Sequence, residues 1–160
     1  RIPAVAPWED PPVIPAGGGT FRGMTTGPSA GTLAGSCAET ESAAESVFSW
    51  TPEISGTAIL HTCSRTDTDF DTVLYVRSES CGAGAEVACK NDNGGCYTTA
   101  NGKARGSRVR MTVTAGQTYF VVVDGANGAA GRLRRSDRRE RGRRPLRSGR
   151  DLREERRVQR

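Results

Sequence analysis

Three aspartates at every second position are the residues whose spacing most directly suggests chemistry. Asp67, Asp69 and Asp71 lie in the segment TDTDFDTVLYVR, directly before a run of apolar residues. Carboxylate oxygens at alternate positions of one loop suit calcium, a hard cation that prefers oxygen ligands. Asp92 and Asp124 could add carboxylates to such a site from separate loops. Calcium binding is therefore one interpretation of this segment, and five aspartates are its candidate ligands.

A structural interpretation of the same aspartates stays open. An EF-hand is excluded, because Thr72 stands where that loop needs glycine and Ser78 stands where it needs glutamate. Asp67 and Asp69 could simply be solvated, while Asp71 caps a turn by accepting backbone N–H bonds. A pair of glycosidase carboxylates is a weaker interpretation, since the chain lacks the unlike environments that two such acids require.

Two further patterns do not support an enzyme. Gly27 to Gly31 matches the GxSxG motif, but no strong strand precedes Ser29 and no helix follows it, as a nucleophile elbow requires. His61 is the sole histidine, on a β-like run, and no nucleophile can be placed beside it. We therefore expect a protein that is not an enzyme and has no catalytic residues.

Five cysteines indicate the redox setting of the chain. No CxxC pair occurs and a single histidine is present, which argues against zinc. Disulfides in a small exported domain are the better interpretation, although the spacing alone does not choose the pairing. An odd number leaves one thiol over. The five are Cys37, Cys63, Cys81, Cys89 and Cys96.

The elements that must position these residues are predicted to be β-strands. Alternating or continuous apolar runs separated by Asn-Gly, Asp-Gly and Ser-Gly turns predict short strands and no helical layer. This pattern predicts an all-β fold, an antiparallel, jelly-roll-like β-sandwich. No apolar run is long enough to span a membrane. The expected strands lie in Ala44–Glu53, Gly56–Cys63, Thr72–Arg77, Ser107–Ala115 and Thr118–Asp124.

Charge and composition divide the 160-residue chain into three parts. Residues 1–19 are rich in proline and glycine and predict a linker, and residues 20–131 hold the β-sandwich. Residues 132–160 contain 14 arginines and 5 acids, whereas residues 1–131 contain 9 basic and 13 acidic residues. A segment so poor in apolar side chains predicts a disordered basic tail. Its composition also resembles out-of-frame translation of GC-rich DNA, which would replace the last strand of the sandwich.

Three segments together resemble a known family, the bacterial pre-peptidase C-terminal domain. They are GTAILHTCSRTDTDFDTVLYVR, CGAGAEVACKNDNGG and GSRVRMTVTAGQTYFVVVDGANGAAG, and the resemblance covers roughly Thr20–Gly131. It implies a jelly-roll accessory domain of a secreted protein. Family members end with a strand of the type Gly-x-Phe-x-Leu-x-Val, and the arginine-rich segment stands in its place here.

The resemblance also implies roles for the cysteines. It implies one disulfide between Cys81 and Cys89 and another between Cys37 and Cys63, with Cys96 as the free thiol. Asp71 and Asp124 match acidic positions of the family motif, and calcium binding does not transfer by motif.

We therefore expect a non-catalytic accessory domain of an exported protein, located outside the cell or on its surface. Its partners would be an adjoining catalytic or surface domain, or an extracellular polymer or protein. One alternative is a calcium-dependent adhesion or protein-binding module. Another is binding of nucleic acid or anionic membrane through the tail, without sequence specificity, because the tail lacks aromatic residues for stacking.

Overall fold

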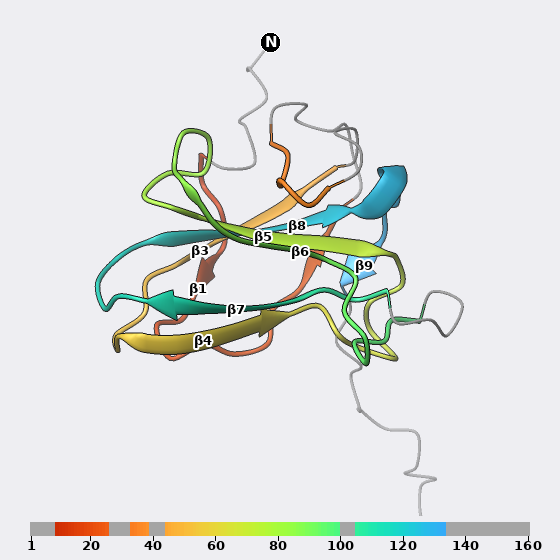
Figure 1. Cartoon of the computed structure of the whole chain (residues 1–160), viewed down its shortest axis with the longest axis horizontal. Coiled ribbons are helices and arrows are strands. Elements are labelled where there is room, and N and C mark those ends of the chain that lie inside the picture. Colours follow the sequence, from red (N-terminus) through yellow and green to blue (C-terminus); the bar gives the residue numbers. More distant parts are fainter. Residues whose placement is uncertain (1–8, 26–32, 39–43, 100–104, 134–160) are drawn as a thin grey trace, which may run out of the picture.

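Two facing β-sheets form the body of the protein. The computed structural model describes residues 9–25, 33–38, 44–99 and 105–133. A five-stranded sheet with the order β1-β3-β8-β5-β6 lies over a two-stranded sheet, β4-β7, and β2 pairs with β9 (Figure 1). The all-β sandwich predicted from the sequence is confirmed. The strands are β1 Val13–Ile14, β2 Gly23–Met24, β3 Ser46–Trp50, β4 Gly56–His61, β5 Thr72–Ser78, β6 Glu86–Asn91, β7 Arg108–Val113, β8 Tyr119–Gly125 and β9 Arg132–Leu133.

The five strands expected from the apolar patterns are all present, as β3, β4, β5, β7 and β8. The sheet is mixed rather than purely antiparallel, because β1 pairs with β3 in the parallel direction. The pattern missed β6, whose sequence EVACKN carries only short or charged side chains around one valine. It also missed β1, β2 and β9, which at two residues each are too short to show a period.

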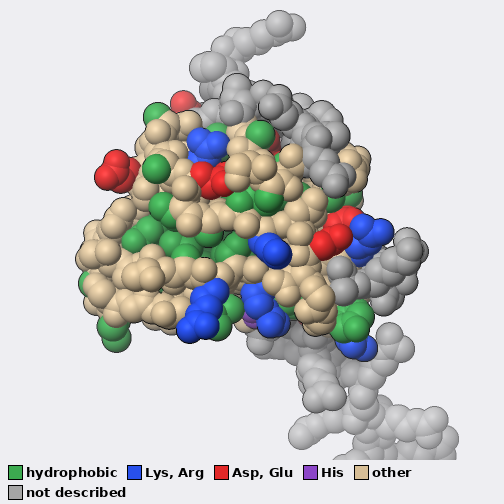
Figure 2. All heavy atoms as spheres, viewed as in Figure 1, with side chains coloured by type: hydrophobic (Ala, Val, Ile, Leu, Met, Phe, Trp, Pro, Cys, Tyr) green, Lys and Arg blue, Asp and Glu red, His purple; other side chains and the backbone are tan. Residues whose placement is uncertain are grey.

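The main core lies between the two sheets. Alternate residues of β7 (Val109, Met111 and Val113) point inward and are buried, as their spacing predicts. Leu74 and Val121 face them from the five-stranded sheet. In the space-filling view, hydrophobic side chains are visible as a band between the layers, and Lys and Arg side chains gather along the β4–β7 side (Figure 2).

A second buried cluster covers the outer face of the five-stranded sheet. Val73, Tyr75 and Val122 point to this side, and Leu33 packs on them from the segment 33–38. The Ser36 N–H donates to the Glu86 carboxylate at 2.8 Å, which ties the segment to β6. β8 is therefore buried on both faces, as its continuous apolar run predicts.

The described part of the expected linker belongs to the sandwich. Ile14 is buried in the main core, and the Ser49 N–H donates to the Pro12 carbonyl at 3.0 Å. The linker prediction is therefore wrong for this segment, because its apolar residues find a place at the sheet edge. Residues 1–8 lie outside the described part.

The expected tail also begins inside the fold. Arg132 and Leu133 form β9, which pairs antiparallel with β2 in the register Met24↔Arg132 and Gly23↔Leu133. The preceding turn contains Asn127 and Gly128 with positive φ angles of 52° and 77°, as the Asn-Gly sequence predicts. The tail prediction is therefore wrong for its first two residues, and residues 134–160 lie outside the described part.

Candidate binding cleft

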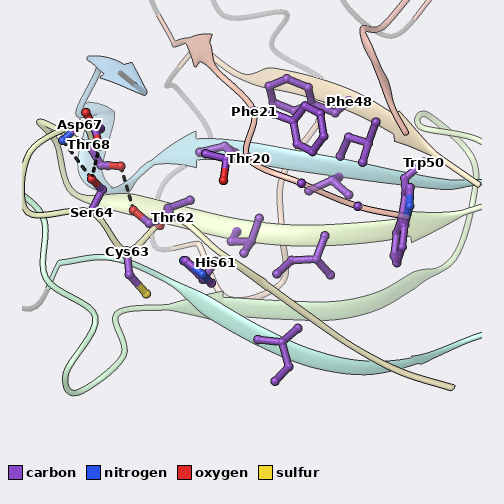
Figure 3. Close-up of a pocket in the computed structure, with 18 residues that line it drawn as sticks. Thr20, Phe21, Phe48, Trp50, His61, Thr62, Cys63, Ser64, Asp67 and Thr68 are labelled. Carbon is purple, nitrogen blue, oxygen red and sulfur yellow. Dashed lines mark hydrogen bonds between the residues drawn. The ribbon is translucent and has the colours of Figure 1, made fainter. Parts of the chain in front are cut away.

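A cleft of about 380 Å³ opens between β4 and the N-terminal segment. Figure 3 shows one wall formed by the backbone near Thr20 and the aromatic side chains, and the other wall formed by β4 and the residues after it. Its volume is at the lower end of the roughly 300–1,000 Å³ range of ligand pockets. The apolar residues that line it include Ile14, Phe21, Phe48, Trp50, Ile59 and Leu60.

The aromatic wall is built by alternation along β3. Phe48 and Trp50 point to the same side of the strand, toward the space between the sheets. Phe21 packs against Phe48 at a ring-centroid distance of 6.4 Å. The Trp50 indole N–H donates to the Ala16 carbonyl at 3.2 Å, so its polar atom is paired while the ring lines the cleft.

The β4 wall presents apolar side chains at the edge of a sheet. Leu60 is half-buried, while the Ile59 side chain is 61% exposed, unusual for a large aliphatic residue on a strand. His61 is exposed, and its register partner across the sheet is Arg108. Within the described residues, β4 pairs only with β7, so its other edge faces the cleft without a strand partner.

One end of the cleft is polar, and Asp67 lies there. Its Oδ2 atom accepts hydrogen bonds from the hydroxyls of Ser64 at 2.8 Å and Thr66 at 2.9 Å. The Ser64 hydroxyl in turn accepts from the Asp67 N–H at 3.0 Å, and the Thr68 hydroxyl donates to the Thr62 carbonyl (Figure 3). The Ser64 hydroxyl therefore caps the local turn, and the Asp67 carboxylate holds that hydroxyl in place.

Asp71 and Asp92 lie together at a second place, on either side of Arg105. One Arg105 nitrogen contacts the Asp71 carboxylate at 2.9 Å and the Asp92 carboxylate at 3.6 Å. Burial and the neighbouring Asp92 raise the pKa of Asp71 above its ordinary value, against the opposing effect of Arg105. A guanidinium thus occupies the position between these two acids.

Asp124 lies at a third place, on the face of the five-stranded sheet opposite the cleft. The neighbouring residues Val121 and Val123 line the cleft, and alternation turns the Asp124 side chain toward Tyr75 and Glu45. Its Oδ1 atom accepts the Gly125 N–H at 2.7 Å. Burial raises the pKa of Asp124 to about 7, despite that hydrogen bond.

The five candidate calcium ligands are therefore not brought to one place, although Asp71 and Asp92 lie together beside Arg105. Asp69 is exposed, and its Oδ1 atom lies against Gly131. In the parts of the chain that the structure describes, no group of three or more His, Cys, Asp or Glu side chains could hold a metal ion. Sequence reasoning failed here because alternation along a loop does not produce a common face as it does in a strand. The chain turns at Asp67 and Asp69, and strand β5 begins only at Thr72.

The cysteine pairing implied by the family resemblance is wrong. Disulfides join Cys37 to Cys89 and Cys63 to Cys96, with Cα–Cα distances of 5.7 and 4.7 Å. Cys81, expected to bond Cys89, is a free thiol, and Cys96, expected to be free, is bonded. This pairing arises because residues 33–38, the covering segment on the outer face of the five-stranded sheet, bring Cys37 onto β6. The loop after β6 folds back to the end of β4.

Cys81 is buried in the second core cluster beneath the covering segment. Burial raises the pKa of its thiol to about 11, so the thiol stays protonated at neutral pH. Its position identifies Cys81 as a packing residue.

The GxSxG segment, Gly27 to Gly31, lies outside the described residues. Sequence reasoning also missed the aromatic wall as a site. Phe48 and Trp50 alternate along the expected strand Ala44–Glu53, but nothing near Phe21 in the sequence signals that the glycine-rich segment returns to face them.

The chain was compared with protein-family models, curated proteins and solved structures, and none of the three comparisons gave a match. Within the described residues, no helix is long and apolar enough to cross a membrane.

Proposed function

We propose that this chain is a non-catalytic binding domain of an exported protein, and that it binds its partner in the cleft between β4 and the aromatic wall. The single observation that carries the proposal is the apolar cleft of about 380 Å³ at an unpaired strand edge. An apolar pocket bordered by a few polar groups is the usual form of a binding site.

The side chains that line the cleft favour binding over catalysis. The titratable ones among the described lining residues are His61 and Asp67. Asp67 is engaged by two hydroxyls, and Cys63 is held in a disulfide. This chemistry supports recognition of an apolar partner.

Export is supported by the two disulfides. They close loops with sequence separations of 52 and 33 residues and suggest an oxidising setting. The resemblance to the pre-peptidase C-terminal domain is consistent with an accessory role beside an adjoining catalytic or surface domain. Calcium-dependent adhesion and tail-driven binding of polyanions remain hypotheses that no contact among the described residues favours.

The test of export compares protein made in an oxidising and in a reducing compartment. We expect the oxidised protein to show one thiol after denaturation and the reduced protein to melt at a clearly lower temperature. Equal melting temperatures for the oxidised form and a form with five free thiols would contradict an exported, disulfide-dependent domain.

A further inference from the structure

We propose that the cleft takes one extended segment of a partner polypeptide, which adds as a strand to the outer edge of β4 and places alternate apolar side chains between the sheets. This inference rests on the proposed binding function and specifies its ligand class. The known mode is β-strand addition, in which backbone hydrogen bonds give affinity and side-chain pockets give specificity.

The hydrogen-bond pattern of β4 leaves backbone groups free to bind such a segment. The Thr62 N–H donates to the Ser107 carbonyl at 3.0 Å, and the β4–β7 register continues from this pair. Bonded and non-bonded pairs alternate in an antiparallel ladder. Even-numbered residues such as Leu60 and Thr62 therefore bond on the side of β7. The odd-numbered residues of β4, namely Thr57, Ile59 and His61, direct their N–H and C=O groups away from β7. Within the described chain, no backbone partner meets them.

The space beside this edge fits the side chains of an added strand. Such a strand would turn every second side chain inward, as Leu60 of β4 already does. The cleft volume lies on that inward side, between Phe21 and Val121. The exposed Ile59 side chain is consistent with an edge that is covered when the partner binds.

The short β2–β9 ladder lies next to the N-terminal wall of the cleft. Its register sets Leu133 opposite Gly23, so positions continuing along the same line would pass Arg22, Phe21 and Thr20. Phe21 and Thr20 line the cleft. In the sequence after β9, however, RRSDRRERGRR offers no apolar side chain from residue 134 to residue 144. The eleven residues after β9 therefore have no apolar side chain of the kind that fits the cleft, whereas a partner segment with alternating apolar residues does.

Two other occupants fit less well. A small apolar molecule would leave the β4 backbone groups unpaired. A second copy of β4 could pair with that edge, but its inward residues Ala58 and Leu60 already pack against its own core and cannot fill the cleft. An extended segment with apolar residues at alternate positions satisfies both the edge and the cavity.

The experiment uses the full oxidised chain carrying Trp8→Phe, so that tryptophan emission reports Trp50 in the cleft wall. The probe is a blocked peptide, Lys-Thr-Val-Thr-Phe-Thr-Val-Thr-Lys, titrated beside a version of scrambled order. Two further versions carry N-methyl groups on alternate amides, one set on the odd positions and the other on the even positions. Added strands bond through every second residue, so we expect one methylated set to abolish the saturable emission change and the other to retain it.

A matched pair of variants tests the edge of β4 itself. Ile59→Pro removes one outward N–H without removing a β4–β7 bond, and Ile59→Val keeps the donor and most of the side chain. We expect Ile59→Pro to weaken peptide binding about tenfold and Ile59→Val to leave it nearly unchanged. If Ile59→Pro does not fold, the methylated peptides on the unchanged chain still decide the question.

Three outcomes would overturn strand addition. The first is equal binding of both methylated peptides, which indicates a site for apolar ligands only. The second is no saturable binding of any peptide. The third is a dimer of the unchanged chain that Ile59→Pro converts to monomer. The first outcome contradicts strand addition but not the proposed binding function. All three outcomes are independent of the test of export by thiol counting and melting temperature.

Discussion

Individual charged residues in this protein serve the fold more than a metal site. Asp67 accepts hydrogen bonds from two hydroxyls, Asp71 is paired with Arg105, and Asp124 is buried near Tyr75 and Glu45. One oxygen of each carboxylate thus makes a local contact, while the Oδ1 atoms of Asp67 and Asp71 are buried without a hydrogen-bond partner among the described residues. The close spacing of Asp67 and Asp71 in the sequence reflects a turn that precedes the buried strand β5.

Asp124 should make the stability of the protein depend on pH. Its pKa is raised from 3.8 to about 7 in the folded state. Between pH 3.8 and about pH 7, the Asp124 carboxyl is therefore protonated in the folded protein and ionised in the unfolded chain. The resulting stability is fully present below about pH 4 and is lost as the pH rises through about 7. Asp124→Asn keeps an acceptor for the Gly125 N–H and removes the buried charge. We expect it to raise the melting temperature at pH 8 and to have little effect at pH 4. Equal shifts at both pH values would contradict this assignment.

Arg105 should hold the two acids beside it. Arg105→Met leaves Asp71 facing Asp92 without a cation, so we expect the Asp71 pKa to rise further when followed by NMR titration. The pair is partly exposed, and the free energy of unfolding should fall by no more than about 1 kcal/mol. Arg110→Met, at an exposed position of β7, is the control and should leave the Asp71 titration unchanged. An unchanged Asp71 pKa in Arg105→Met would contradict the pairing.

At the scale of elements, the disulfides fasten the irregular parts of the chain onto the sheets. One fixes the covering segment to β6, and the other fixes the loop after β6 to the end of β4. Replacing Cys63 and Cys96 together by alanine should reduce the free energy of unfolding by about 2–4 kcal/mol, because the unfolded chain regains freedom. Denaturant unfolding measures this. Cys81→Ala is the control and should cost less, since it removes only one buried sulfur atom. A larger loss in the control would contradict the assignment of the bridge.

The strands that the sequence predicts are those whose burial is repetitive. Val109, Met111 and Val113 show a period of two, and β8 shows a continuous apolar run, so both were predictable. The position of Ile14 was not, because a two-residue strand has no period and its place depends on β3, far along the chain. The cleft was unpredictable for the same reason. Phe21 and Ile59 line it together only because the N-terminal segment packs beside β4.

At the scale of the whole molecule, the buried residues of both core clusters lie between Ile14 and Ala126. A chain that ends after Leu133 keeps all of these and the β2–β9 pair. We expect it to melt within about 4 °C of the full chain, equivalent to less than about 1 kcal/mol, by calorimetry. Any salt-sensitive binding of nucleic acid should disappear with residues 134–160. If nucleic-acid binding survives the truncation, its site lies on the β-sandwich and not on residues 134–160.

The proposal that this protein is an exported domain held together by disulfides depends most on which cysteines are joined. The most direct measurement is mass spectrometric mapping of peptides from the unreduced protein, digested after alkylation of free thiols under denaturing conditions. We predict linked peptides containing Cys37 with Cys89 and Cys63 with Cys96, and an alkylated Cys81. A Cys81–Cys89 link, or alkylation of all five cysteines, would contradict the account.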